Sequence, residues 1–356
     1  MRVTLGDVCE KGSSNLKQSD VINKTGAYPI YGAAGYLGNV DFYHQDKPYV
    51  AVVKDGAGIG RTTLHPAKSS VIGTMQYLLP KSNVLPEYLY YVVQYMHLEK
   101  YFTGATIPHI YFKDYKAEQF NLDAMERQKE IVASLQKVET FIKVRQQQLQ
   151  KLDELVKARF VEMFGDCKSR VSMNELCSII TDGTHQPPRF QESGIPFIFV
   201  SNLVGNVVTY DAEKFISEDT YAELYKRTPI EIGDLLLSTV GSYGHPAVVT
   251  EDRKFLFQRH IAYLKPRHNM VNSFYLHSAL LAPDGQRQIE EKVKGIAQKT
   301  LNLSEIKKIV VPLPTIEEQN QFEKFVNQTD KSKVAVQKSL DEAQLLFDSL
   351  MQQYFG

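Results

Sequence analysis

The chain contains few cysteines, and they do not form the patterns that disulfide frameworks or zinc sites need. Its 356 residues include three cysteines, Cys9, Cys167 and Cys177, an odd number without a Cys-x-x-Cys pair. Small secreted domains depend on paired cysteines, and structural zinc sites depend on closely spaced ones. The cysteine usage therefore argues against both, and it is typical of a protein in a reducing cytosol.

Long apolar runs are also missing. The first residues, MRVTLGDVCE, lack the apolar segment of a secretory signal, and no run of about eighteen apolar residues occurs in the sequence. We therefore expect a protein that is neither exported through a standard signal nor inserted in a membrane.

The chain has no excess of charge of either sign. Its 41 basic residues balance 41 acidic ones; residues 1–124 carry 12 basic and 11 acidic residues, and residues 166–315 carry 17 of each. Proteins that bind nucleic acids usually have a local excess of lysine and arginine. If this chain binds DNA, folding must gather its positive side chains on one face.

Catalytic signatures are absent too. The sequence has no HExxH, no GxSxG, no helicase-type nucleotide loop and no Asn-Pro-Pro-Tyr-type methyltransferase motif. The glycine-rich stretch DGAGIGR (55–61) lacks the Gly-Lys-Ser/Thr end of a phosphate-binding loop. We expect tight turns between strands here and at a second, similar place, formed by Gly56, Gly58, Gly60, Gly241 and Gly244.

A second polar stretch, TDGTHQPPR (181–189), contains a lone histidine and no set of metal ligands at suitable spacing. One interpretation is a surface loop stiffened by its two prolines. The other is a loop that lays Thr184, His185 and Arg189 along base edges or the backbone of DNA.

The sequence does contain a long internal repeat. Shifted by 191 residues, residues 125–165 align with 316–356 without a gap, so that LVKARFVEMFG matches LFDSLMQQYFG at the two ends. Further upstream, TLGDVC (4–9) resembles SMNELC (172–177), and VVKDGAGIGR (52–61) resembles LLSTVGSYGH (236–245). Solenoid repeats are roughly 20–50 residues long, so this period indicates a duplicated domain.

The repeated tails have the pattern of long helices. Apolar residues recur at alternating steps of three and four, which is the seam of a coiled coil, and about 39 residues correspond to a helix of roughly 58 Å. TIEE (315–318) fits a capping box with Thr315 as N-cap, and DAME (123–126) is a weaker counterpart. We expect the two helices to pack on each other; the alternative is that each docks on its own domain. The predicted helix–helix packing residues are Ile131, Leu135, Val138, Ile142, Leu149, Leu152, Val156, Phe322, Val326, Val336, Leu340, Phe347 and Leu350.

The two bodies that precede the tails have the composition of mixed α/β domains. Aromatic and β-branched residues broken by turn residues predict short strands within 28–43, 48–53, 195–210 and 234–239. The segments 86–102 and 272–281 are predicted helices.

These motifs, in this order, resemble the specificity (S) subunits of type I restriction–modification systems over essentially the whole chain. YPIYGAAGYLGNV with VVKDGAGIGR is similar to one class of their target-recognition domains, and TDGTHQPPRFQESGIPFIFVSNL with IEIGDLLLSTVGSYG is similar to another. LPTIEEQNQF and LDAMERQKEI resemble the starts of the family's conserved helical regions. The first copy departs from the family in having NLDAMERQ where a Pro-Leu-Pro lead is preferred, which marks the start of that helix less clearly.

The resemblance implies four regions: a first target-recognition domain at 1–122, a central conserved coiled-coil helix at 123–165, a second target-recognition domain at 166–313 and a C-terminal conserved coiled-coil helix at 314–356. It implies an α/β (α+β) fold in which the helices form an antiparallel coiled coil with pseudo-two-fold symmetry. Each recognition domain would read one half of a split, asymmetric target in double-stranded DNA.

The resemblance also implies a non-catalytic, cytoplasmic subunit of a bacterial or archaeal complex. Its helices would dock two modification (methyltransferase) subunits, and restriction/translocase subunits would join through the complex. S-adenosylmethionine, ATP and Mg²⁺ would belong to those partners. Our candidate DNA-contacting residues are Tyr31, Tyr36, Lys54, Arg61, Lys68, Thr184, His185, Arg189, Asn202, Ser238, Tyr243, His245 and Arg259.

Two other functions remain open at this point. A coiled-coil adaptor without direct DNA readout fits the zero net charge, whereas a stand-alone nuclease would need a catalytic site that the sequence does not show. Sequence-dependent DNA binding would distinguish a reading subunit from an adaptor.

Overall fold

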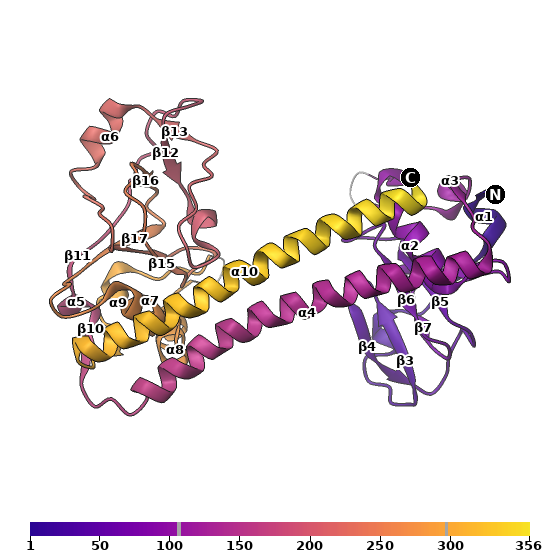
Figure 1. The fold of residues 1–356 in the computed structure, drawn as a ribbon, viewed down its shortest axis with the longest axis horizontal. Helices are drawn as coiled ribbons and strands as arrows, with labels where there is room; N and C mark the ends of the chain where they lie inside the picture. Colours follow the sequence, from indigo (N-terminus) through magenta and orange to yellow (C-terminus); the bar gives the residue numbers. More distant parts are fainter. Residues whose placement is uncertain (105–107, 296–297) are drawn as a thin grey trace. The chain divides into compact units, whose positions relative to one another are not determined.

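A computed structural model describes residues 1–104, 108–295 and 298–356, which fold as two compact units (Figure 1). Unit 1 comprises Met1–Gln146 and Lys338–Gly356, and unit 2 comprises Gln147–Gln337. Each unit therefore combines one globular body with parts of two long helices. No helix among the described residues has the length and apolar character that crossing a membrane requires.

The body of unit 1 contains three small sheets. Strands β1 and β9 pair antiparallel; an antiparallel sheet has the order β2-β8-β5-β6; and a third sheet has the order β4-β3-β7, in which β3 and β7 are parallel. The elements of this body are β1 (Arg2–Thr4), α1 (Leu5–Val8), β2 (Cys9–Ser13), η1 (Gln18–Asp20), β3 (Tyr28–Gly32), β4 (Gly35–Val40), β5 (Tyr49–Val53), β6 (Thr62–His65), β7 (Ser70–Val71), β8 (Met75–Pro80), α2 (Pro86–Tyr95), η2 (Leu98–Tyr101), α3 (Phe112–Tyr115) and β9 (Gln119–Asn121).

The body of unit 2 has the same three kinds of sheet. Strands β10 and β18 pair antiparallel, an antiparallel sheet has the order β11-β17-β14-β15, and a third sheet has the order β13-β12-β16 with β12 and β16 parallel. Its elements are β10 (Arg170–Ser172), α5 (Met173–Leu176), β11 (Cys177–Asp182), β12 (Ile195–Ile198), η3 (Val200–Leu203), β13 (Phe215–Ile216), α6 (Glu218–Leu224), β14 (Leu235–Ser238), β15 (Pro246–Val248), β16 (Leu256–Phe257), β17 (Ile261–Pro266), α7 (Ser273–Leu281), α8 (Pro283–Lys292), α9 (Leu303–Ile306) and β18 (Val310–Pro312).

The shared sheet orders explain the weak sequence repeat of the bodies. TLGDVC and SMNELC both form the end of a strand, a one-turn helix and the first residue of the next strand, and Cys9 and Cys177 are buried at equivalent places. VVKDGAGIGR and LLSTVGSYGH both span a hairpin, β5–β6 in unit 1 and β14–β15 in unit 2. The bodies therefore have the same topology although their loops have diverged.

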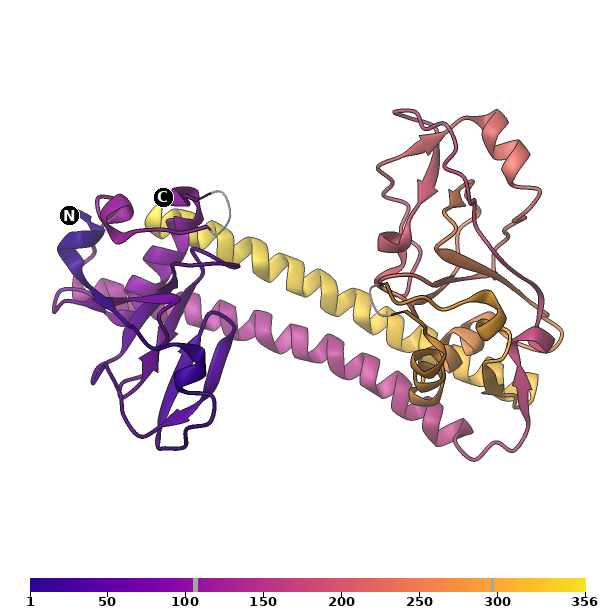
Figure 2. The ribbon, with the colours of Figure 1, turned by 180° about the vertical axis from the view of Figure 1, so that it is seen from behind.

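The repeated tails form the helices α4 (Met125–Phe164) and α10 (Ile316–Phe355), of 40 residues each. In unit 1 the first half of α4 lies beside the last half of α10, and Ile131 and Leu135 share an apolar cluster with Phe347, Met351 and Phe355. Tyrosines of α2 complete this cluster. The helix segments run antiparallel (Figures 1 and 2), as the family resemblance implied.

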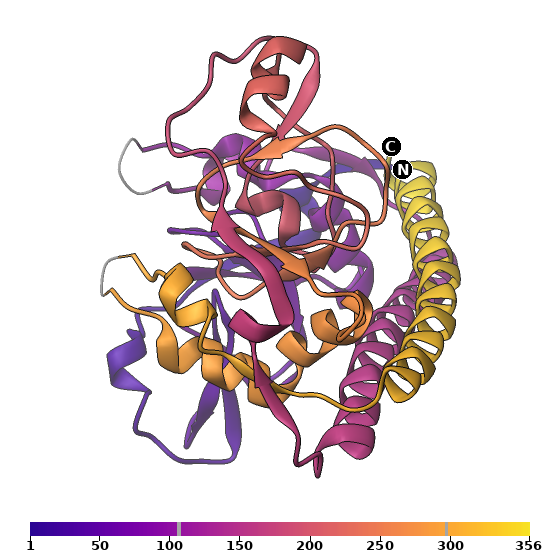
Figure 3. The ribbon, with the colours of Figure 1, turned by 90° about the vertical axis from the view of Figure 1, so that its left-hand side faces the viewer.

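Unit 2 repeats this arrangement with the other two helix halves. Phe160 and Phe164 of α4 lie 5.5 and 5.6 Å from Phe322 of α10, measured between ring centroids, and Tyr275 of α7 packs against them. Figure 3 shows the two helices along one flank of this body. Throughout α4 and α10 the predicted seam positions are buried or partly buried, because the step of three and four keeps them on one face.

A buried glutamine joins each body to its helix. In unit 1, Gln128 accepts a hydrogen bond from the N–H of Leu85 (2.9 Å) and donates to the carbonyls of Asn83 and Asp123. Gln128 and its repeat partner Gln319 are both fully buried.

In unit 2, Gln319 accepts from the N–H of Asn272 (2.8 Å) and donates to the carbonyls of Met270 and Pro314. The identity of these two glutamines in the repeat therefore corresponds to an identical set of main-chain bonds.

The starts of the two helices differ. At α10, Thr315 and Glu318 form the predicted capping box, with the N–H of Thr315 donating to Glu318 Oε2 and the N–H of Glu318 donating to Thr315 Oγ1. At α4 the carboxylate of Asp123 instead accepts from the hydroxyl of Tyr88 (2.9 Å), and the described hydrogen bonds include no reciprocal cap with Glu126.

The glycine turns are confirmed, and so is a short strand within 195–210. Gly56, Gly58 and Gly60 all have φ between 82° and 85° in the β5–β6 turn, which only glycine adopts readily. Within 195–210 the strand β12 ends at Ile198. Asn202 accepts from the N–H of Phe199 and donates to the carbonyl of Asp211, so its side chain folds the following segment into a turn.

Candidate functional site

In unit 1 three of the candidate residues lie together. Tyr31 and Tyr36 flank the turn between β3 and β4 with ring centroids 6.0 Å apart, and Arg61 donates from Nη1 to the carbonyl of Ala33 in that turn (2.9 Å). A Cβ at Gly58 would lie 2.3 Å from the Arg61 guanidinium, so the glycine leaves room for it. The glycine-rich turn therefore positions an exposed guanidinium beside exposed Tyr36.

Tyr31 is the less accessible of the two tyrosines. Its ring is half-buried against His65, and burial followed by the neighbouring Tyr36 raises its pKa above the usual value. Tyr36 is 61% exposed, and its hydroxyl donates to Asn39. Tyr36 and Arg61 are thus the accessible members of this group.

Two further candidates of unit 1 lie elsewhere. Lys54 Nζ is 3.7 Å from Asp55 Oδ2, and Asp55 also binds His109 at 2.5 Å. Lys68 is exposed in the β6–β7 connection with a positive φ of 55°. The Asp55–His109 contact could not be predicted from the sequence, because the two residues lie far apart in the chain.

In unit 2 the loop TDGTHQPPR begins where β11 ends. The N–H of Thr184 donates to the carbonyl of Phe257 (3.0 Å), and the N–H of Arg259 donates to the carbonyl of Thr184 (3.1 Å). Gly183 permits this approach, because a Cβ there would lie 2.3 Å from the Phe257 carbonyl oxygen. These contacts bring Thr184 and Arg259 together although 75 positions separate them in the sequence.

The loop also carries a charged cluster at its base. Asp182 Oδ2 lies 2.8 Å from His185 Nε2, and Asp182 Oδ1 accepts from Arg227 Nη2 (2.6 Å). The Asp182 carboxylate therefore orients the histidine and an arginine on the same side of the loop.

A pocket of about 400 Å³ opens beside this cluster. Phe190, Phe197 and Phe199 form its apolar wall, with Lys214 Nζ 4.8 Å from the centroid of the Phe190 ring. Polar residues at the pocket are Thr184, His185, Lys214, Gln258, Arg259 and His260. Arg189 lines a second pocket formed by the same loop, together with His185 and Arg227.

His260 differs electrostatically from its neighbours. Partial burial and then the adjacent Arg259 charge lower its pKa below the usual value for histidine, which favours the neutral ring at neutral pH. Its Nε2 accepts from Arg259 Nε at 3.3 Å. The positive charge at this edge of the pocket therefore comes from Arg259 and Lys214.

The remaining candidates of unit 2 lie in less accessible positions. Tyr243 donates its hydroxyl to Glu290 of α8 and receives a bond from Lys299, and His245 contacts the side chain of Asn206. Ser238 is fully buried and accepts from the N–H of His245.

Asn202 is also buried, with its side chain committed to the turn described above. Ser238 and Asn202 therefore have structural bonds, and we leave both out of the proposed DNA-contacting set.

Several residues of this site were not among those predicted from the sequence. Gln258 and His260 flank Arg259 in the run QRH between β16 and β17, so a polar run between two buried strands was an available signal. Lys214 and Arg227 lie in irregular segments, where no pattern pointed to them.

The arrangement suits recognition of polar surfaces. Guanidinium, ammonium, hydroxyl and amide groups are the donors that contact phosphates and base edges in protein–DNA complexes. Among residues 1–104, 108–295 and 298–356, no group of three or more His, Cys, Asp or Glu side chains is placed to hold a metal ion.

Comparison with known proteins identifies relatives of both units. Residues 1–154 and 170–343 each match the family described as Type I restriction modification DNA specificity domain. The chain is 30% identical over 170 residues to the type I restriction enzyme EcoBI specificity subunit of Escherichia coli, an alignment that covers 48% of this chain and 36% of that protein. It is 22% identical over 189 residues to the putative type I restriction enzyme MjaX specificity subunit of Methanocaldococcus jannaschii, covering 51% and 44%. Both alignments span less than half of these curated relatives.

The fold matches a solved structure over nearly its full length. The S subunit of a type I restriction–modification system from M. genitalium aligns with a TM-score of 0.59 and 16% identity, covering 100% of this chain and 96% of that one. At this identity the similarity establishes the fold.

Proposed function

The chain belongs to the family of type I restriction–modification DNA specificity proteins, with two specificity domains in tandem, and we propose that it reads a bipartite, asymmetric DNA target with them. Each body would contact one half of the target, and the helices would set the distance between the halves. The duplicated topology with diverged loops supports this proposal, because shared scaffolds with different loops are suited to different base sequences.

We propose that accessible polar side chains form the DNA-contacting surface of each unit. In unit 1 they are Tyr36 and Arg61 beside the β3–β4 turn. In unit 2 they are His185 and Arg259 around the loop that starts at Thr184. A few such groups on each body are enough to read a short sequence. In protein–DNA complexes most contacts are to phosphates and position the protein, and a smaller number of base contacts specify the sequence.

Two arginine substitutions test the division between the bodies. Arg61→Ala should relax specificity in one half of the target, and Arg259→Ala should relax it in the other, each by the roughly 1–3 kcal/mol of a good bidentate base contact. The complex with its methylating subunits would be assayed by sequencing the methylated sites. Arg253→Ala is a matched control, because Arg253 is exposed in unit 2 but lies over the Tyr210 ring. Equal changes in both halves from either variant would contradict the proposal.

Exchange of a whole body gives an independent test. Replacing residues 170–311 with those of another recognition domain should change one half-site and leave the other unchanged. A salt-dependent gel shift with the same complex separates this function from that of a coiled-coil adaptor, which would show no sequence preference.

The proposed partners follow from the same family membership. We infer that the helices dock methylating subunits, two per chain, and that restriction/translocase subunits join through the complex. In this scheme the chain is not itself an enzyme: S-adenosylmethionine, ATP and Mg²⁺ belong to the partners. Incubating the purified chain alone with DNA and Mg²⁺ should give no cleavage.

A further inference from the structure

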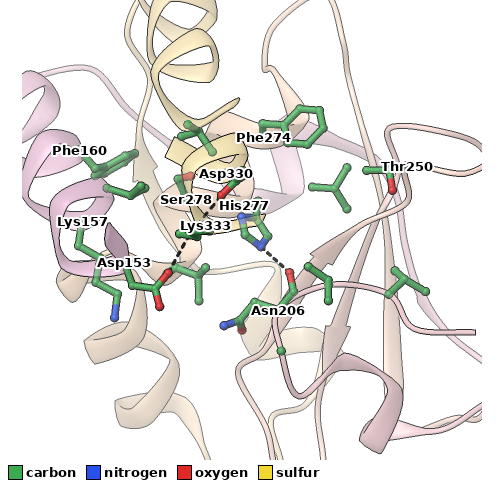
Figure 4. Close-up of a pocket in the computed structure, with 17 residues that line it drawn as sticks. Asp153, Lys157, Phe160, Asn206, Thr250, Phe274, His277, Ser278, Asp330 and Lys333 are labelled. Carbon is green, nitrogen blue, oxygen red and sulfur yellow. Dashed lines mark hydrogen bonds and ion pairs between the residues drawn. The ribbon is translucent and has the colours of Figure 1, made fainter. Parts of the chain in front are cut away.

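A lysine lies in the apolar seam of the coiled coil in unit 2. Lys333 occupies a seam position of α10, and its Nζ lies 2.7 Å from Asp153 Oδ1 of α4 and 3.2 Å from Asp330 Oδ1 of its own helix (Figure 4). The lysine side chain is 28% exposed, whereas both carboxylates are more than half exposed. The three residues line one side of a pocket of about 310 Å³.

The charge of this lysine depends on the opposite helix. Burial disfavours the ammonium form, but the hydrogen bond that Lys333 donates to Asp153 and the charges of both carboxylates outweigh it, so the pKa of Lys333 is raised. Placing a charge against apolar residues is unfavourable unless the charge is paired. A seam lysine without a carboxylate across from it would therefore destabilise the helix pair.

The internal repeat shows that this contact is present once where a symmetric pair would have it twice. The residue equivalent to Lys333 in α4 is Ile142, and the residue equivalent to Asp153 in α10 is Gln344. Ile142 packs against the apolar cluster of unit 1, in which Phe347 lies. The two helices thus share the spacing of their seams and differ at this cross-helix contact.

We propose that the Lys333–Asp153 pair selects unlike helices as partners, so that α4 pairs with α10 and neither pairs with its own equivalent in a second copy of the chain. Because the seams are similar, an α10–α10 pair with the same spacing is an available alternative structure. It would place each Lys333 opposite Gln344 of the other copy, without a carboxylate. An α4–α4 pair would likewise place each Asp153 opposite Ile142.

Like and unlike pairing differ in their contacts. Two chains with unlike pairing hold two Lys333–Asp153 contacts, and the repeat would place Ile142 opposite Gln344 in each chain. The same chains with like pairing hold neither kind. A single polar residue in an otherwise apolar seam is a known determinant of partner choice in coiled coils. Arg145, which aligns with Val336, gives the two seams a second difference.

The test transposes the carboxylate from α4 to α10 in the full chain. In Asp153→Gln with Gln344→Asp, an α10–α10 pair gains two Lys333–Asp contacts, and the unlike pair loses its one. Light scattering after size exclusion should show a monomer for the original chain and a concentration-dependent dimer for the transposed variant. A monomer at every concentration, with unchanged thermal stability, would overturn the proposal.

Disulfide trapping identifies which helices pair. The α10–α10 register would bring residue 339 of each copy close to its equivalent, so Ser339→Cys in a Cys167→Ser background reports this pairing. We expect about tenfold more trapped dimer from the transposed variant than from the original charges. Asp330→Asn is the matched control, because it removes the carboxylate on the lysine's own helix and should leave trapping at the original level. An increase with Asp330→Asn equal to that of the transposed variant would contradict the assignment to Asp153.

A second variant keeps the test open if the transposed chain does not fold. Lys333→Ile removes the charge and gives α10 the residue that α4 has at this place, which makes like and unlike pairing equivalent here. Trapping should rise above the original level. Unchanged trapping in this folded variant would refute the proposal. The measurement needs neither DNA nor partner subunits, so its outcome is independent of the proposed reading function.

Discussion

At the scale of single residues, a buried histidine gives unit 1 a defined response to acid. His65 is buried against the rings of Tyr31 and Tyr49, and its Nε2 lies 2.7 Å from Thr63 Oγ1. Burial lowers its pKa from 6.5 to about 4. The folded state therefore keeps the ring neutral at a pH where the unfolded chain binds a proton.

This difference predicts a loss of stability on acidification. The contribution of His65 is complete above pH 6.5 and is lost as the pH falls towards 4, by about 3 kcal/mol in total. His65→Gln, which retains a group able to bond Thr63, should flatten the unfolding free energy of unit 1 across this window. Calorimetric melts of the full chain between pH 7 and 4 would measure it.

His185→Gln serves as the control for this prediction, because that ring is exposed in unit 2. The same acid dependence of unit 1 in His65→Gln and in the original chain would show that the buried histidine does not cause it.

A second prediction at the residue scale concerns Gly183, where the TDGTHQPPR loop of unit 2 approaches β16. Gly183→Ala places a Cβ 2.3 and 2.4 Å from the carbonyl oxygens of Phe257 and Gln258, so the loop must move away from β16. We expect a loss of unfolding free energy of about 2 kcal/mol or more, together with weaker DNA binding. Gly205→Ala is the matched control, since its nearest neighbour atom would lie 3.5 Å away. Comparing melting temperatures and gel shifts of the two variants checks the prediction, which fails if both behave alike.

Individual contact residues were the hardest feature to obtain from the sequence. In the sequence Asn202 and Arg259 could not be told apart, because both are polar residues near predicted turns. Only the structure shows that Asn202 turns inward to bond Phe199 and Asp211 while Arg259 stays exposed. The side on which a loop residue lies depends on contacts with distant segments, such as Thr184 with Phe257, and local pattern does not contain that information.

At the scale of elements, the buried glutamines at the helix starts carry a specific stability prediction. Gln319→Leu keeps the side chain's approximate volume but leaves the N–H of Asn272 and the carbonyls of Met270 and Pro314 without this partner. Each unpaired buried group costs about 1–3 kcal/mol, so unit 2 should lose on the order of 3 kcal/mol or more.

The equivalent change, Gln128→Leu, should destabilise unit 1 by a similar amount. Gln136→Leu, at an exposed position of the same helix, is the control and should change little. Separate calorimetric transitions for the two units would report the effects, and equal stability of Gln128→Leu and Gln136→Leu would disprove the role of the buried amide.

The regular elements were the most predictable part of the fold. The alternating spacing of apolar residues by three and four predicted α4 and α10, because it persists along both helices. Thr315 with Glu318 marked the start of α10. Short strands were less certain, since an apolar run such as 195–210 has the same composition whether it extends or turns. There a side chain, Asn202, supplied the bonds that a neighbouring strand would otherwise have made.

At the scale of the whole molecule, the length of the helices makes a prediction about the DNA target. Inserting seven residues in both α4 and α10 keeps the seam in phase and lengthens each helix by about 10 Å. Since base pairs are spaced by about 3.4 Å, the preferred gap between half-sites should grow by about three base pairs. Sequencing of methylated sites with the assembled complex would measure the gap.

A five-residue insertion is the control, because at 3.6 residues per turn it rotates the seam away from the partner helix and should impair folding or assembly. An unchanged gap with the seven-residue insertion would mean that the helices do not set the spacing.

The duplication was visible in the sequence, whereas its structural detail was not. The tails align without a gap because an insertion or deletion would shift the seam out of phase, so the offset of 191 residues was evident. The bodies have drifted in loop length, and their common sheet orders become apparent only when β2-β8-β5-β6 is set beside β11-β17-β14-β15.

The attachment of each body through Gln128 or Gln319 involves main-chain atoms alone on the side of the body. Main-chain N–H and C=O groups are the same whatever amino acid occupies a position. Substitutions at Asn83, Leu85 or Met270 that preserve the backbone path therefore leave these glutamine bonds unchanged, whereas Asn272 also bonds Asn320 and Glu323 of α10 through its side chain. Recombination could then exchange one reading body for another of unrelated surface chemistry, and the newcomer would find the same glutamine waiting on the old helix.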